Sequence, residues 1–124
     1  MVTGIVDEDG QALVPLSMRR TRDSEPTQLQ VWVDTAFTGD LALSESLIRQ
    51  LGLRKATGTW AVYADGTTKR VDAFTGFIEW FGETRKIEVV AGNNATPLLG
   101  VCLLLGHRLE VDYHALTVTI DLPF

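Results

Sequence analysis

The sequence predicts an all-β protein, a closed or folded sheet with one or two short helices. Three observations lead to this fold class: short runs in which apolar and polar residues alternate, turn residues between those runs, and only two stretches with helical spacing. Alternation with a period of two is typical of strands with one buried face. Two helices are too few for repeated βαβ units, so an all-β sheet fits better. The 124 residues suit one domain of ordinary size, and we expect a single domain over residues 1–124.

The first third of the chain predicts three strands. Thr3 to Val6 and Gln11 to Met18 are apolar runs separated by the turn residues Asp7 to Gly10, which is the pattern of a β-hairpin. Gln28 to Val33 is the third run. Trp32 adds apolar bulk on the side opposite to the other large apolar residues of this run, so we expect the strand to be buried on both faces.

A short helix is expected from Ser44 to Leu51. Ser44 is a suitable N-cap, Glu45 favours the positive end of the helix, and Gly52 can end it in a left-handed conformation. Its apolar face consists of Leu47, Ile48 and Leu51.

The second half of the chain predicts further strands and one more helix. Residues 60–74 contain Asp65-Gly66 between two β-favouring runs, which is a strong signal for a hairpin. The run "PLLGVCLLLG" predicts a short strand ending at Leu99 and a short apolar helix ending near Gly106. Four more strands are expected at Thr75–Trp80, Lys86–Ala91, Leu109–Tyr113 and Leu116–Leu122.

Charge and composition exclude several classes of function. The net charge of −5 argues against nucleic acid as a partner, because phosphate binding needs clustered Lys and Arg. The chain shows no signal-peptide pattern and no apolar run long enough to span a bilayer, so we expect no membrane partner and a cytoplasmic location. The single cysteine, Cys102, lies in an apolar run and is expected to be a buried structural thiol.

Metal binding is not supported by the residues that could serve as ligands. A zinc site would have to use His107, His114 and carboxylates, and their spacing matches no known ligand pattern. We therefore expect no metal and no cofactor.

One acidic residue stands out by its position. Asp34 follows a strongly apolar run in "VWVDTAFTGDLAL". Burial makes an unpaired carboxylate costly, so Asp34 either has partners at this point or has a function. The simpler alternative is that Asp34 caps the following turn through local backbone hydrogen bonds, as aspartate often does.

Two motifs in a fixed order resemble a known family. The loop "VWVDTAFTGDLAL" is followed by the expected hairpin and then by "PLLGVCLLLGHRLEVDY", an apolar-apolar-Gly segment before a helix and a strand. Over residues 28–122 this order is similar to that of the retropepsin-like aspartic proteases, including their bacterial members. The resemblance implies a single lobe of the acid protease fold, a closed β-barrel or folded sheet.

The resemblance also implies a reaction and an oligomeric state. Asp34 would be the catalytic carboxylate of an aspartic endopeptidase. Two carboxylates about 3 Å apart share a proton and divide the roles of acid and base, which is how aspartic proteases hydrolyse peptide bonds. Since this chain carries one such loop, the resemblance implies a homodimer in which two Asp34 side chains meet at the two-fold axis.

The remaining site residues are carried over from the same resemblance. The C-terminal strand, Leu116 to Phe124, is expected to join the dimer interface, because a long alternating edge strand needs a partner. An extended peptide or protein would be the substrate, bound largely through its main chain. The site residues comprise the loop residues Thr35, Ala36, Thr38 and Gly39, the packing residues Leu98, Leu99 and Gly100, and the flap residues Tyr63, Ala64, Asp65, Gly66 and Thr67.

Two departures from the family pattern keep other functions open. Ala36 stands where the family usually has Gly, and Phe37 where Ala or Ser is common. Ala36 places a methyl group near both the expected substrate and the second subunit. The alternatives are a non-catalytic dimeric peptide-binding module on the same fold, and a structural β-barrel domain with no site.

Overall fold

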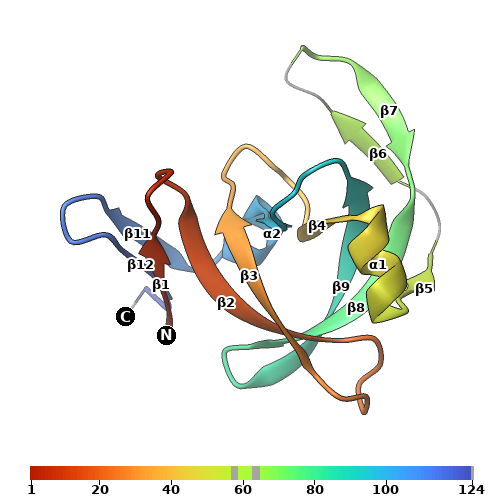
Figure 1. Ribbon diagram of the computed structural model, residues 1–124, viewed down its shortest axis with the longest axis horizontal. Helices are drawn as coiled ribbons and strands as arrows, with labels where there is room; N and C mark the ends of the chain where they lie inside the picture. Colours follow the sequence, from red (N-terminus) through yellow and green to blue (C-terminus); the bar gives the residue numbers. More distant parts are fainter. Residues whose placement is uncertain (57–58, 63–64, 124) are drawn as a thin grey trace.

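The computed structural model describes residues 1–56, 59–62 and 65–123 and shows a mostly β protein with two short helices (Figure 1). Twelve strands are found in that part of the chain, so the predicted all-β class with short helices is confirmed. The strands are β1 Val2–Val6, β2 Ala12–Arg19, β3 Thr27–Val33, β4 Leu41–Ser44, β5 Arg54–Lys55, β6 Thr59–Val62, β7 Thr68–Val71, β8 Ala73–Trp80, β9 Glu83–Gly92, β10 Leu98–Leu99, β11 Arg108–Asp112 and β12 Thr117–Asp121, and the helices are α1 Glu45–Leu51 and α2 Val101–Leu104.

Ten of the strands form one sheet that closes on itself. Their order is β11-β12-β1-β2-β3-β10-β4-β9-β8-β5, and β2 also pairs with β8. The first residues of β2 pair with β1, while Met18 and Arg19 at its other end pair with β8. The extra pairing turns β2, β3, β10, β4, β9 and β8 into a ring, which is the closed sheet that the sequence predicts.

The core lies inside this ring. Five of its fully buried side chains come from five different ring strands, and burying each stabilises the fold by about 1.5–3 kcal/mol. These side chains are Val14, Val31, Leu41, Val89 and Leu99.

The helix α1 begins and ends where the sequence predicts. The Ser44 side chain accepts a hydrogen bond from the Leu47 backbone N–H, and Gly52 ends the helix at φ 68°. Ile48 is buried, and Leu47 and Leu51 pack against the core. The helix is therefore anchored by its caps and by the predicted apolar face.

The terminal strands pair with each other. β12 lies between β11 and β1, so it has a neighbour on both sides within one chain. The edges of the ten-stranded sheet are β11 and β5. The expectation that the C-terminal strand is an edge strand in need of a partner is therefore wrong, because β1 already supplies that partner.

Two further expectations about burial are wrong. β3 is buried on one face only, because Trp32 points away from the core and remains 37% exposed. Cys102 is exposed rather than buried, since it lies on the outer side of the short helix α2. The strands β4 and β5 were not predicted, because they are too short to show alternation.

The hairpin of β6 and β7 forms a separate two-stranded sheet, as the Asp65-Gly66 signal predicts. Gly66 has φ 86°, a left-handed conformation that favours glycine. Tyr63 and Ala64, which the family resemblance assigns to the flap, lie outside the described residues. Neither helix in the described part of the chain has the length and apolar character needed to cross a membrane.

Candidate active site

Asp34 lies at the end of β3, where β3 runs parallel to β10. The Trp32 backbone N–H donates to the Pro97 carbonyl oxygen at 2.8 Å, and the Asp34 N–H donates to the Leu99 carbonyl oxygen at 2.9 Å. β10 pairs with β4 on its other side, so it is inserted between the two strands that flank the Asp34 loop. This insertion fixes both ends of the loop.

The Asp34 carboxylate is oriented by the turn that follows it. Its Oδ1 accepts a hydrogen bond from the Ala36 backbone N–H at 2.9 Å. The Phe37 N–H donates to the Asp34 carbonyl oxygen at 3.2 Å, which closes the turn. The side chain is half-buried, and within residues 1–56, 59–62 and 65–123 no hydrogen bond joins it to another carboxylate. Oδ1 of Asp34 therefore caps the turn that follows β3, which is the local role that an aspartate often has.

The rest of the Asp34 loop is held by backbone N–H groups of the glycine segment, Leu98–Gly100, and of the first residues of α2. Gly100 donates to the Asp40 carbonyl oxygen at 2.9 Å, and Val101 donates to that of Phe37 at 2.8 Å. Cys102 donates twice, from its N–H to the Gly39 carbonyl oxygen at 3.2 Å and from its Sγ to the Thr38 carbonyl oxygen at 2.8 Å. The first N–H groups of a helix have no partners within the helix, and here the loop carbonyls satisfy those at the start of α2.

Only glycine fits at position 100. A Cβ there would overlap the Gly39 carbonyl oxygen and would lie 2.8 Å from that of Phe37 and 2.7 Å from Phe37 Cδ2. A Cβ on Gly39 would lie 2.7 Å from Phe37 Cζ. The Phe37 ring thus occupies the space that two glycines leave open, which explains why an aromatic residue is accommodated in this loop.

The loop does not require glycine at position 36. In the described part of the chain the non-glycine residues with positive φ are Phe81 and Leu116, so Ala36 carries no left-handed strain. Ala36 is exposed, as is Thr35. The family resemblance also implies that Thr35 hydrogen-bonds across the dimer to brace the facing loop, which needs a second chain and stays a prediction.

An apolar row lies beside the loop on one face of the sheet. Leu98 pairs with Trp32 in β3 and with Ala42 in β4, and residues paired in this way share a face. Trp32 is partly exposed and Leu98 is half-buried, so these two side chains are open to a ligand, whereas Ala42 is buried. This row was not predicted from the sequence, although the outward position of Trp32 in the alternation of β3 is its signal.

The β6–β7 hairpin stands apart from the large sheet, on the same upper side of the view as the loop after β3 (Figure 1). At its tip Asp65 Oδ1 accepts hydrogen bonds from the Thr67 side chain at 2.7 Å and from the Thr67 N–H at 3.0 Å. The side-chain bond, then the backbone bond, holds the pKa of Asp65 below its usual range.

The described residues contain no group of three His, Cys, Asp or Glu side chains that could hold a metal ion. The arrangement offers instead one oriented carboxylate, an apolar row beside it, and a separate hairpin. These parts suit a site that holds an extended chain and acts on it through carboxylate chemistry.

The closed sheet, the clamped Asp34 loop and the glycine segment before α2 together define the retropepsin-like fold of aspartic proteases. Two solved structures share this fold. A retropepsin-like aspartic protease from Rickettsia conorii has 17% sequence identity and a TM-score of 0.60, covering 97% of this chain and 89% of that chain. The protease of EIAV, solved with the inhibitor HBY-793, has 18% identity and a TM-score of 0.59, covering 79% of this chain and 88% of that chain. No protein-family model and no curated protein sequence matches this chain.

Proposed function

We propose that the protein is an aspartic endopeptidase that works as a homodimer, with one Asp34 from each subunit. The observation that carries this proposal is the placement of Asp34: half-buried, at the tip of β3, with its backbone held by Leu99 and its carboxylate oriented by Ala36. The retropepsin-like fold supports it, because proteases of this fold occur among the similar structures. A single chain supplies one such loop, so the second carboxylate comes from a second copy.

In this proposal the two carboxylates share one proton. The ionised Asp34 removes a proton from a water molecule, whose oxygen attacks the peptide carbonyl carbon, and the protonated Asp34 gives its proton to the carbonyl oxygen. The carboxyl group that took the proton from water then gives it to the leaving nitrogen as the C–N bond breaks, and the other carboxylate takes a proton from a hydroxyl of the tetrahedral intermediate, which restores the shared proton. The reaction consumes one water and needs one of the two carboxyl groups to remain protonated, so we expect activity at acidic to mildly acidic pH.

The substrate in this proposal is an extended peptide. Its main chain would pair with backbone groups of the site, and its apolar side chains would contact Trp32 and Leu98. The tip of the β6–β7 hairpin would cover the peptide. Apolar residues next to the cleaved bond are therefore expected.

A second candidate is a non-catalytic dimeric peptide-binding module on the same fold. The observation that favours it is Ala36, an exposed methyl group where the family usually has Gly, close to the place where a substrate and the second subunit would meet. This alternative predicts peptide binding without cleavage.

The deciding experiment is cleavage of a mixed peptide library from about pH 3 to pH 7, a range that spans the titration of a carboxylate pair. Asp34→Asn keeps an Oδ1 acceptor for the Ala36 N–H, so the loop is expected to fold normally. The matched control is Asp121→Asn, because Asp121 Oδ1 also accepts from a neighbouring backbone N–H, that of Leu122 at 2.9 Å, but lies on β12. We expect the wild type and the control to cleave, and Asp34→Asn to lose at least about a thousandfold in rate.

Other results would point elsewhere. A strict monomer at high protein concentration contradicts the mechanism, since one carboxylate cannot form the pair. Peptide binding that is equal in the wild type and Asp34→Asn, with no cleavage by either folded dimer, establishes the peptide-binding module. Equal cleavage by both proteins removes Asp34 from the catalytic role.

A further inference from the structure

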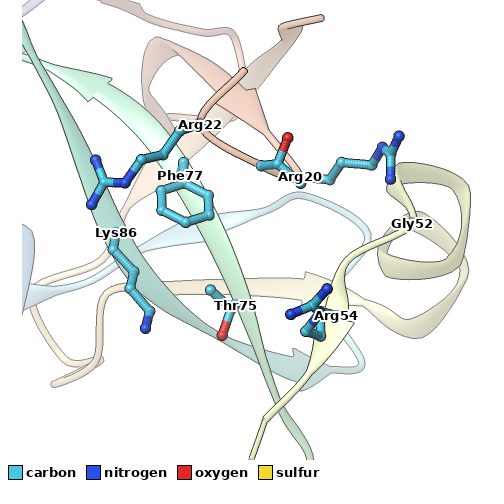
Figure 2. Close-up of a pocket in the computed structure, with 8 residues that line it drawn as sticks. Arg20, Arg22, Gly52, Arg54, Thr75, Phe77 and Lys86 are labelled. Carbon is cyan, nitrogen blue, oxygen red and sulfur yellow. The ribbon is translucent and has the colours of Figure 1, made fainter. Parts of the chain in front are cut away.

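A basic hollow lies at the end of the molecule away from Asp34. It has a volume of about 350 Å³ and is formed by the turn after β2, the end of α1, β5, β8 and β9 (Figure 2). β3 separates the two regions, because the β2–β3 turn lies before its first residue and Asp34 follows its last. Among the described residues, four cationic side chains and no acidic one line the hollow, together with Thr75 and Phe77: Arg20, Arg22, Arg54 and Lys86.

The strand register explains why Arg54, Thr75, Phe77 and Lys86 lie on one side of the sheet. Arg54 in β5 pairs with Thr75 in β8, and Phe77, two residues further on, pairs with Lys86 in β9. Alternate residues of a strand point to the same face, so Thr75 and Phe77 share the floor of the hollow. The β2–β3 turn borders the hollow, and its two arginines diverge, Arg22 toward Phe77 and Arg20 toward Gly52 (Figure 2).

Asp23 and Glu25 lie in the neighbouring hollow that Arg20 also lines, so the excess of positive charge rests on Arg22, Arg54 and Lys86. Glu79 lies further along the same face of β8, but it is paired with Arg19 at 3.7 Å and accepts a hydrogen bond from Thr84 Oγ1 at 3.0 Å. Glu88 pairs with Thr75 across β8 and β9 and lies outside the lining. Four of the 11 Lys and Arg residues thus line one small hollow in a chain whose net charge is −5.

The hollow also has an aromatic surface. The guanidinium carbon of Arg22 lies 5.0 Å from the centre of the half-buried Phe77 ring, within the range of a cation–π interaction. Nη1 of Arg22 donates to the Thr84 carbonyl oxygen at 3.5 Å, which helps to hold that side chain in place. Phe77 with Arg22 therefore forms a planar, partly apolar surface, and Arg54 and Lys86 are cationic side chains in the same hollow.

These features specify the chemistry of a ligand. Guanidinium groups bind phosphate oxygens through two parallel hydrogen bonds, and a lysine adds a point charge. A volume of this size is in the range of pockets that take small molecules. A ligand with several phosphate charges and an organic part would satisfy both the cations and Phe77.

We propose that this hollow binds a small phosphorylated molecule with two or more phosphate groups. Its phosphates lie between Arg54 and Lys86, and its organic part contacts Phe77 and Arg22. The site is separate from Asp34 and does not depend on the proposed peptidase activity, so it can be tested in the Asp34→Asn protein.

The experiment is a calorimetric titration of the full-length Asp34→Asn protein with pyrophosphate and with adenosine diphosphate, at about 0.15 M ionic strength to suppress diffuse attraction. We expect saturable binding of one molecule per chain, and tighter binding of the nucleotide because it reaches Phe77. The double variant Arg54→Gln/Lys86→Gln is expected to weaken binding about tenfold or more, since each charged hydrogen bond contributes to affinity.

The matched control is Arg85→Gln, which removes one exposed cation next to Lys86. Arg85 pairs with the core residue Ile78, so it belongs to the face of β9 opposite the hollow. Its affinity for both probes is expected to equal that of the parent protein. An equal loss in Arg85→Gln and in the double variant would overturn the proposal by showing diffuse attraction, as would absence of saturable binding.

The class of ligand is tested by an acidic peptide. An octaglutamate peptide carries more charge than pyrophosphate but lacks phosphate geometry. Tighter binding of the peptide than of either phosphate probe would overturn the assignment of a phosphorylated ligand, and weaker binding supports it. Amide signals of Thr21, Gly52 and Phe77 are expected to shift on nucleotide binding while those of Ala36 and Gly100 stay unchanged, which places the probe in the hollow.

Discussion

The loop after β3 and the β6–β7 hairpin are the two regions that the proposed reaction needs, and they are held in opposite ways. The loop is tied to the glycine segment by backbone bonds from Asp34, Gly100, Val101 and Cys102. Within the described part of the chain, the hairpin strands pair with each other and lie outside the ten-stranded sheet. The carboxylate is thus fixed by the core of the fold, whereas the hairpin depends mainly on its own turn.

Because of this difference, changes in the loop and changes in the hairpin are expected to affect stability and substrate binding differently. A change in the loop disturbs both the core and the site, because Leu99 and Leu103 beside the clamp are fully buried. A change in the hairpin is expected to alter substrate binding while leaving the large sheet intact. Local stability of this kind differs between regions of one protein and can be measured region by region.

The largest effect is expected from Gly100→Ala. The added methyl would overlap the Gly39 carbonyl oxygen, so the loop or α2 must move. We expect the free energy of unfolding to fall by about 2–4 kcal/mol, measured by urea denaturation, together with loss of any cleavage.

Gly106→Ala serves as the control at the other end of α2. A Cβ there has no neighbour within 4 Å, and only the positive φ of 80° opposes it. A loss of about 1 kcal/mol is expected from that backbone strain. Equal losses in the two variants would show that the clamp at Gly100 is not what makes the loop rigid.

A smaller and local effect is expected from Gly66→Ala in the hairpin. Gly66 has φ 86°, and an added methyl there would have no neighbour within 4 Å, so strain in the turn is the only cost, about 1 kcal/mol. Hydrogen exchange of β6 and β7 amides should accelerate about fivefold, while the global free energy of unfolding changes by less than about 0.5 kcal/mol. A global loss as large as that of Gly100→Ala would mean that the hairpin is part of the same cooperative unit.

The smallest effect is expected from Asp112→Ala in the β11–β12 turn. The backbone N–H groups of Ala115 and His114 donate to Asp112 Oδ1, both at 2.9 Å, and hold the pKa of this carboxyl below its usual range. A lowered pKa in the folded state adds stability that is fully present above about pH 4 and is lost as the pH falls further. The variant should therefore be less stable than the wild type at pH 7, and the difference in thermal stability should shrink as the pH falls below about 4. A difference that does not change with pH would contradict this.

Local signals in the sequence predicted local structure well. Ser44 and Gly52 define α1, and Asp65-Gly66 marks the hairpin, because caps and turns depend on a few adjacent residues. The order of the Asp34 loop and the glycine segment indicated the fold, and the structural comparison confirms it.

Features that depend on distant residues were not predictable in the same way. The insertion of β10 between β3 and β4 joins segments that lie far apart in the sequence, and nothing in either segment specifies the partner. Trp32 was assigned to the core because alternation does not say which face another layer will cover. The basic hollow draws Arg20, Arg54 and Lys86 from three separate elements, so no cluster of charge appears in the sequence.

The pairing of β1 with β12 brings the two ends of the chain together, Val2 beside Ile120. Each of these strands is the hydrogen-bonding neighbour of the other within one chain, so neither needs a strand from a second copy at this position. In the proposed dimer, dilution is expected to separate the two Asp34 loops, so that activity falls as the protein is diluted. The amount of the protein would itself act as the switch, because the concentration of assembled sites rises with the square of the concentration of free chains.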